Sequence, residues 1–278
     1  GEAFVNEGDE VIVTEAEHHS DIVPWQMMCK RKGAVLKVLP VDDDGYLKVE
    51  MLDELISSKT RILACTHISN VLGIVNPVKQ IIDKCHAEGI PVLVDGAQGI
   101  VHSKVDVQDL DCDFYVFSGH KMYAATGTGV LYGKKKWLEA MPPYMGGGEM
   151  VGTVTFAETT YAPLPMKFEA GTQNFASTAT LKQAVEFINL LSDNELIEYN
   201  DKVRDYLLDY FNSDERIRLF GVPRGTSDEK IPLFSFVVEG VHHEDLALIL
   251  DKMGIAVRSG QMCAEPLMDR FGVTGMLR

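Results

Sequence analysis

The feature that most constrains the fold of this 278-residue chain is a regular alternation of strand-like and helical stretches. The strand-like runs are EVIVTE (10–15), AVLKVLP (34–40), RILACT (61–66), IPVLVD (90–95), DFYVFS (113–118) and GVLYG (129–133). Helical patterns fall between the earlier runs, near residues 21–31, 50–57 and 77–88. This alternation predicts an α/β fold with a mainly parallel sheet and helices on its faces.

The pattern changes near residue 178, where apolar residues follow helical spacing over a longer stretch. The elements expected after this point are a helix near 178–192, a second helix through residue 213, strands near 216–220 and 233–238, a helix from His243 to Met253, and a strand running into Arg258. We interpret the two long helices as a junction. The sequence thus predicts a large domain over residues 1–190 and a smaller α+β domain over residues 191–278.

Composition excludes several classes of partner. Hydrophobic residues make up 46% of the chain, yet no apolar run approaches the ~20 residues that span a bilayer. The formal net charge of −15, from 26 Lys and Arg against 41 Asp and Glu, repels nucleic acid and anionic lipid. We therefore expect a small-molecule ligand, with no nucleic-acid or membrane partner.

Five scattered cysteines, at positions 29, 65, 85, 112 and 263, form no C-x-x-C pair. Such a set argues against a disulfide framework or a zinc ribbon and favours a reducing compartment such as the cytoplasm. We expect the first four to be small buried side chains. Cys263 differs, because it follows a predicted strand in a polar loop where a thiol stays accessible, and the nearby Arg258 favours its thiolate.

Polar residues gather where several predicted strands end. They are His18 after EVIVTEAE, Asn70 after RILACTHIS, Asp95 and Gln98 in IPVLVDGAQ, and Ser118, His120 and Lys121 in DFYVFSGHK. Each alone is more often a surface residue. Ligands of open α/β sheets nevertheless bind at the carboxyl ends of strands, so the set as a whole is a candidate site. The pair His242 and His243 is better explained as a helix start than as a metal site.

This set of residues matches the needs of pyridoxal phosphate. That cofactor requires a lysine for a Schiff base, a carboxylate at its pyridine nitrogen, a flat group against its ring and donors for its phosphate. The residues that could meet these needs are Lys121 for the amine, Asp95 for the carboxylate, His18 for stacking, Gln98 or Asn70 for the phenolic oxygen, and Ser118 with His120 for the phosphate. A lysine at the end of a buried strand is then explained, because an imine carries no free ammonium charge.

A family resemblance rests on several runs along essentially the whole chain. They are EHHSDIVPWQ, THISNVLG, VDGAQ, DFYVFSGHKMYAATGTGVLYG, FEAGTQN and AVRSGQMCAEPLM. In this order they closely resemble the class V aminotransferase-like cysteine desulfurases of fold-type I, in the SufS/CsdB branch that includes selenocysteine lyases. The resemblance implies a fold-type I transferase that binds pyridoxal 5'-phosphate as a homodimer.

The resemblance also implies a role for each matching residue. These roles are the cofactor-binding lysine for Lys121, ring stacking for His18, contacts to the pyridine nitrogen and phenolic oxygen for Asp95 and Gln98, a cofactor or substrate contact for Asn70, and a phosphate contact in the neighbouring subunit for Thr172. Cys263 becomes the sulfur acceptor, whose thiolate takes the sulfur of L-cysteine and leaves a persulfide and alanine. Lys121 and His18 are the candidates for proton transfer.

The resemblance implies an arginine a short distance beyond the cysteine that binds the substrate carboxylate, and this position matches Arg278. A guanidinium can bind a carboxylate through two parallel hydrogen bonds. Arg258 is expected to be a second substrate contact or to stabilise the loop. The implied function is a cysteine desulfurase that passes persulfide to a SufE- or SufU-like acceptor for iron–sulfur cluster assembly. The alternatives are a selenocysteine lyase acting on L-selenocysteine, and a catalytically incomplete scaffold of the same fold.

The chain departs from the family pattern at its ends and near the cysteine. It starts at Gly1, without the family's upstream Gly-Thr-Thr turn, and it stops at Arg278, before the family's terminal helices finish. We therefore expect a piece of a longer protein, with part of the large domain missing and the small domain truncated. Gln261 and Met262 stand where relatives often have two histidines, a change expected to alter loop polarity or partner preference.

Overall fold

A six-stranded sheet forms the body of the molecule. The computed structural model describes residues 1–191, 194–226 and 229–278, and this sheet lies in the first of these ranges. Its strands are β1 (Glu10–Thr14), β2 (Val35–Leu39), β3 (Thr60–Thr66), β4 (Val92–Asp95), β5 (Phe114–Ser118) and β6 (Gly129–Gly133). Each of the six runs predicted from the sequence is therefore a strand, which confirms the α/β class.

The strands follow the order β2-β1-β3-β4-β5-β6, and all neighbours pair in parallel except β5 and β6. Parallel strands are buried on both faces, which explains why β3 is apolar along most of its length. Because β1, β3, β4 and β5 run the same way, their carboxyl ends lie along one edge of the sheet. The polar residues that follow these strands meet at that edge.

The helices of this half lie where the sequence predicts them. They are α1 (His19–Lys32), η1 (Val49–Met51), α2 (Leu52–Leu55) and α3 (Val78–Ala87). Gly33 ends α1 in the left-handed conformation, at φ 67°, and its N–H donates to the Cys29 carbonyl. In α3 the buried positions Val78, Ile81, Ile82 and Cys85 recur at helical spacing, so this helix packs one face on the sheet.

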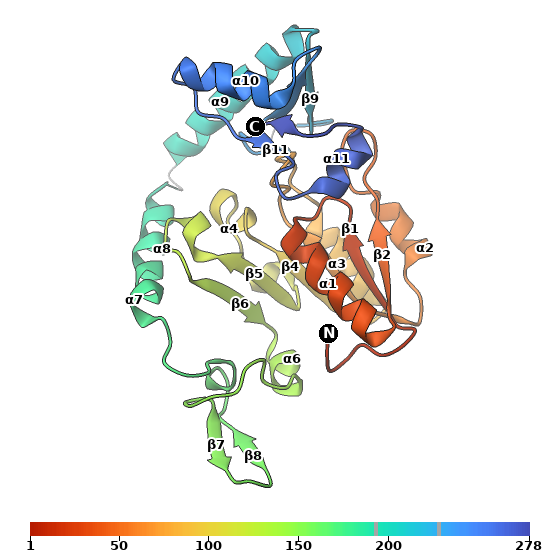
Figure 1. Ribbon diagram of the computed structural model, residues 1–278, viewed down its shortest axis with the longest axis vertical. Helices are drawn as coiled ribbons and strands as arrows, with labels where there is room; N and C mark the ends of the chain where they lie inside the picture. Colours follow the sequence, from red (N-terminus) through yellow and green to blue (C-terminus); the bar gives the residue numbers. More distant parts are fainter. Residues whose placement is uncertain (192–193, 227–228) are drawn as a thin grey trace.

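Several short elements follow the strands and are absent from the sequence prediction. They are α4 (Gly99–His102), α5 (Val107–Leu110), η2 (Gly119–Met122), α6 (Lys135–Ala140), η3 (Met166–Phe168) and α7 (Phe175–Thr178), with an antiparallel hairpin of β7 (Val151–Val154) and β8 (Thr159–Tyr161). The hairpin projects away from the body at the bottom of Figure 1. Its strands are mostly exposed, so they lack the apolar alternation that identifies a strand in a sequence.

The C-terminal part contains a second sheet and three longer helices. Its elements are α8 (Thr180–Leu191), α9 (Asn194–Ser213), β9 (Ile217–Phe220), β10 (Ser235–Val238), α10 (His243–Lys252), β11 (Ser259–Gly260), α11 (Glu265–Phe271) and β12 (Met276–Leu277). The strand order is β11-β12-β10-β9, and every pairing is antiparallel. Residue 192, the last of the helix predicted near 178–192, lies outside the described residues. His242 caps α10, accepting a hydrogen bond from the Glu244 N–H, as its predicted place at a helix start requires.

The strand predicted to run into Arg258 is wrong. The ladder begins one residue later, at β11, while residues 255–258 belong to no strand. Arg258 instead exchanges two backbone hydrogen bonds with Arg278, of 3.0 and 2.8 Å. The apolar residues that suggested a strand are only a short run before this pair.

One buried core joins the two parts of the chain. Leu39, Leu63 and Leu72 of the larger sheet region belong to the same cluster as Leu267 and Phe271 of α11. In Figure 1 the C-terminal elements lie above the larger sheet, with α11 beside β1 and β2. A boundary between residues 190 and 191 therefore stays a prediction, because the C-terminal part buries side chains in the core of the large one.

Cys29, Cys65, Cys85 and Cys112 are buried free thiols, which confirms the prediction for these four. Within residues 1–191, 194–226 and 229–278, no helix is long and apolar enough to cross a membrane.

Candidate active site

His18 stands at the start of α1 and caps it. Its Nδ1 accepts a hydrogen bond of 3.1 Å from the Ser20 backbone N–H and lies 2.8 Å from the Ser20 hydroxyl. Because a backbone N–H can only donate, Nδ1 carries no proton, and the neutral ring holds its proton on Nε2. Burial and then the positive charge of Lys121 lower the pKa of His18, while Asp95 raises it. The three predicted residues are thus close enough to act on one another.

Lys121 lies just beyond β5, in the short helix η2. The amide of Gly119 donates a 2.9 Å hydrogen bond to the Thr128 carbonyl, which fixes η2 to the start of β6. Lys121 itself is half-buried. No hydrogen bond or ion pair links its amine to any residue that the structure describes. Lys121 therefore lies just past the end of the strand, as predicted, in the short helix that follows it, where no described residue binds its amine.

Asp95 ends β4, the strand that pairs in parallel with β5. Its Oδ1 accepts a 2.9 Å hydrogen bond from the Ala97 N–H. Among the described residues no other hydrogen bond reaches this half-buried carboxylate, so Oδ2 is available to a cationic group. Asp95 and Lys121 come from the ends of adjacent strands, as predicted.

The remaining predicted cofactor contacts fall into two groups. Gln98, Ser118 and His120 lie at the same sheet edge, at the start of α4, the end of β5 and within η2. Thr172 does not join them. It is exposed between η3 and α7, and no contact connects it to the other site residues within the part of the chain described.

A turn of the C-terminal part brings Cys263 to this edge. The backbone N–H of His19 donates to the Cys263 carbonyl at 2.8 Å, and the Asn70 side-chain amide donates to the Met262 carbonyl at 2.8 Å. Met262 is buried in the core and Cys263 is half-buried. Of the two residues that replace histidines, Met262 therefore anchors the turn, and Gln261 is exposed.

Arg278 adjoins this turn. Its Nη1 donates a 2.7 Å hydrogen bond to the Asn70 carbonyl, so the last residue of the chain is held in place. Burial and then the charge of Arg258 lower the pKa of Arg278. Arg258 is exposed, and its charge also acts on His18. Arg278 thus contacts the same Asn70 that binds the Cys263 turn, and the charge of Arg258 acts on His18.

A buried pair of carboxyl groups behind His18 was missed by sequence reasoning. Glu17 Oε1 accepts hydrogen bonds from the Thr14 hydroxyl at 2.5 Å and the Thr66 N–H at 2.7 Å, and Asp21 Oδ1 accepts from Trp25 Nε1 at 2.9 Å. Burial raises the pKa of both groups, that of Asp21 to about 7. The only sequence signal was a pair of acids on either side of the two histidines, which on a helix start usually indicates a solvated turn.

The comparisons with known proteins agree with this geometry. The family model for aminotransferase class-V matches residues 1–278. The chain belongs to the class-V aminotransferase family. A cysteine desulfurase of Cronobacter sakazakii is 45% identical over 279 residues, and one of Escherichia coli O7:K1 is 46% identical. Each match covers 100% of this chain and 68% of the relative.

Solved structures give the same result. The cysteine desulfurase CsdA (S-sulfonic acid) from Escherichia coli superimposes with a TM-score of 0.90 at 41% identity, over 98% of this chain and 67% of that one. The apo cysteine desulfurase from Thermococcus onnurineus NA1 has the same TM-score at 31% identity, with the same coverage. The resemblance stated from the motifs and the fold-type I architecture are therefore confirmed.

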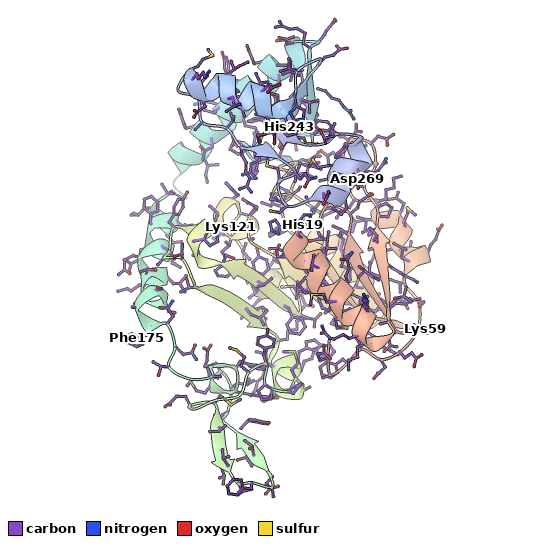
Figure 2. The ribbon with its side chains drawn as sticks, in the orientation of Figure 1. His19, Lys59, Lys121, Phe175, His243 and Asp269 are labelled. Atoms are coloured by element: carbon purple, nitrogen blue, oxygen red, sulfur yellow. The ribbon has the colours of Figure 1, made fainter. Side chains whose placement is uncertain are left out.

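The residues present fit pyridoxal phosphate. Among the described residues Lys121 has an amine without a partner, and Asp95 has one carboxylate oxygen without a hydrogen bond. His18 has a flat ring whose pKa is lowered by Lys121 and raised by Asp95. Figure 2 shows Lys121 and His19 at the upper edge of the larger sheet, below the C-terminal elements.

Proposed function

We propose that the protein is a pyridoxal-phosphate-dependent cysteine desulfurase that converts L-cysteine to L-alanine and keeps the sulfur on Cys263. The observation that carries this is the 2.8 Å hydrogen bond from the His19 N–H to the Cys263 carbonyl. It joins the backbone of Cys263 to that of His19, the neighbour of His18, whose pKa is under the influence of Lys121 and Asp95. A free thiol next to an amine and a carboxylate is what sulfur transfer requires, and the cysteine desulfurases at 45% and 46% identity support it.

The cofactor is pyridoxal phosphate, which when bound supplies the electron sink that weakens the Cβ–S bond of the substrate. The carboxylate of Asp95 would hold the ring nitrogen protonated. Lys121 would bind the cofactor and, once released, move the proton at the substrate Cα. His18 would lie against the ring with its Nε2 proton as a donor.

Sulfur transfer itself falls to Cys263. Its thiolate attacks the substrate sulfur, so a new S–S bond forms while the Cβ–S bond breaks and leaves its electron pair on the carbon side. That carbon takes up a proton and becomes the methyl group of alanine. The enzyme keeps one extra sulfur as a persulfide, and no external oxidant or reductant is needed.

Arg278 would grip the substrate carboxylate, because a half-buried guanidinium binds a carboxylate strongly and with defined geometry. Asn70 supports this placement, since its carbonyl holds Nη1 and its amide holds the Met262 carbonyl. Arg258 would add positive charge at the mouth of the site. Gln98, Ser118 and His120 would contact the phenolic oxygen and phosphate of the cofactor.

We further propose a cytoplasmic homodimer that passes its persulfide to a SufE- or SufU-like protein for iron–sulfur cluster assembly. Five free thiols favour a reducing compartment. Thr172 is exposed and makes no contact with the other site residues among those described, as expected of a residue that completes the site of a second subunit. The half-exposed thiol of Cys263 allows an acceptor to reach the persulfide.

The cofactor assignment is tested by the visible spectrum of the chain after pyridoxal phosphate is added. We expect an absorbance band that is lost in Lys121→Ala, because this amine forms the covalent link, and that changes when L-cysteine is added. The matched control is Lys182→Ala, since Lys182 is an exposed lysine of α8 paired with Glu186. A band that survives in Lys121→Ala would refute the role of Lys121. Absence of the band in both the wild type and Lys182→Ala would favour the scaffold alternative.

A further inference from the structure

The turn that carries Cys263 has an unusual backbone. Met262 and Cys263 are consecutive non-glycine residues in the left-handed region, at φ 56° and 57°. Side chains other than glycine adopt this conformation at an energetic cost, so it persists only where the surroundings hold it. Something must therefore fix this turn.

Apolar packing stabilises part of this turn. Met262 and Ala264, on either side of Cys263, are 3% and 0% exposed and belong to the main core. The Ala264 N–H also donates to the Gln261 carbonyl at 3.0 Å, which closes the turn. These contacts anchor the neighbours of Cys263 but leave its own carbonyl and the following helix to be held by other groups.

One residue near the N-terminus, His19, forms hydrogen bonds with both the Cys263 carbonyl and the start of the following helix. His19 donates its backbone N–H to the Cys263 carbonyl at 2.8 Å, and its ring Nε2 accepts a 3.0 Å hydrogen bond from the Glu265 N–H. Glu265 begins α11, whose cap residue Ala264 makes no side-chain capping bond. The His19 ring thus takes one of the N–H groups that a helix start leaves unpaired.

We propose that His19 is a positioning residue for sulfur transfer, which holds the Cys263 turn at the cofactor site from both sides of the cysteine. This inference rests on the proposed function for its purpose, although the contacts stand without it. The adjacent His18 caps α1 at the proposed cofactor site, so the two neighbouring histidines connect the cofactor side and the sulfur-acceptor side of one site. In this contact the His19 Nε2 carries no proton, because it accepts from a backbone N–H, which can only donate.

The test compares His19→Ala with His19→Gln in the full chain. Alanine removes the ring acceptor but keeps the backbone hydrogen bond to Cys263, and glutamine restores an oxygen that can accept from the Glu265 N–H. We expect hydrogen exchange of the Glu265 amide to rise roughly fivefold in His19→Ala, as one lost hydrogen bond allows, and to recover in His19→Gln. Alkylation of Cys263 by iodoacetamide, without cofactor or substrate, should change in parallel.

The matched control is His242→Ala. His242 makes the same kind of contact at α10, where its Nδ1 accepts from the Glu244 N–H at 3.3 Å. This variant should speed exchange near Glu244 and leave Cys263 alkylation unchanged. In turnover, His19→Ala should lower kcat for alanine formation while KM for L-cysteine and the cofactor absorbance band stay as in the wild type.

Unchanged Glu265 exchange and Cys263 alkylation in His19→Ala would overturn the inference, as would the same alkylation change in His242→Ala. If His19→Ala does not fold, the test uses His19→Gln alone. This variant should match the wild type in exchange of the Glu265 amide and in alkylation of Cys263, and a difference of several fold in either would count against the inference. Failure of the proposed function is seen separately, as absence of alanine formation by the wild type, while exchange and alkylation still report on His19.

Discussion

At the scale of single residues, the site depends on how burial sets the charge of a few groups. Burial and Lys121 lower the pKa of His18, and its cap contact requires that Nδ1 carry no proton. Behind it, Glu17 and Asp21 are buried together and each leaves one oxygen without a hydrogen bond in the described structure. Two charged carboxylates so placed would repel, so the pair is expected to share a proton.

The buried pair makes stability depend on pH. The pKa of Asp21 is raised from 3.8 to about 7 in the folded state, so the folded protein binds this proton more tightly than the unfolded chain. Its stabilising contribution is complete at pH values below 3.8 and is lost as the pH rises through about 7. We expect Asp21→Asn to flatten this decline, which over the whole range is on the order of 4 kcal/mol in the wild type.

Urea unfolding at several pH values measures this effect. Asn can still accept from Trp25 Nε1, so the variant removes the titration of this side chain and keeps that contact. Asp109→Asn, at an exposed position of α5, is the matched control and should follow the wild-type curve. A wild-type stability that rises between pH 5 and pH 8, with the same rise in Asp21→Asn, would contradict the proton-sharing pair.

At the scale of elements, the strand ends were predictable and the turns were not. Buried strands such as β3 need continuous apolar runs, so the sequence identifies all six strands of the larger sheet and with them the edge where His18, Asp95 and Lys121 meet. The exposed hairpin β7–β8 and the seven-residue helix α11 carry no such signal. The hydrogen bond from the Glu265 N–H to the His19 ring, beside the Cys263 turn, joins residues 246 positions apart. Local sequence patterns cannot reveal such a contact.

The turn that presents Lys121 gives a prediction at this scale. A Cβ added at Gly119 would lie 2.4 Å from Thr128 Oγ1 and 3.3 Å from the Thr128 carbonyl oxygen. Thr128 cannot yield easily, because its hydroxyl is bonded to the Ala125 carbonyl and its own carbonyl to Gly119. We expect Gly119→Ala to lower the free energy of unfolding by about 1–3 kcal/mol and to weaken cofactor binding at Lys121.

Urea unfolding and titration with pyridoxal phosphate measure the two effects. Gly146→Ala is the control, since an added Cβ there meets no atom within 4 Å. If Gly119→Ala binds the cofactor as tightly as Gly146→Ala, the close packing of η2 on Thr128 does not position Lys121.

At the scale of the whole molecule, one core and one exposed flank describe the chain. The C-terminal part packs α11 into the core of the larger part, so the neighbours of Cys263 belong to the same core as the strands of the larger sheet. Along the flank formed by α7 and α8 (Figure 1), Phe175 and Leu190 are 72% and 73% exposed, and Tyr144, in the loop after α6, is 89% exposed. Apolar exposure of this extent is typical of a surface that is covered in an assembly.

The proposed homodimer predicts what covers that flank. Sedimentation velocity should give the mass of two chains, and Leu190→Glu should shift the protein toward the mass of one, because a buried charge at the contact is costly. Lys182→Ala, which changes the net charge by the same single unit at an exposed, ion-paired position of α8, is the control. A wild-type chain with the mass of a single subunit would exclude a role for Thr172 across a dimer.

The most direct test of the account is mass spectrometry of the peptide that contains Cys263, after the protein has reacted with L-cysteine and pyridoxal phosphate. The account predicts that this peptide gains the mass of one sulfur atom, removable by a thiol reductant, and that Cys263→Ala forms neither the persulfide nor alanine from L-cysteine. Release of selenium from L-selenocysteine by Cys263→Ala would mark the selenocysteine lyase alternative. Formation of alanine by Cys263→Ala at the wild-type rate, with no added sulfur on Cys263 in the wild type, would contradict the central claim.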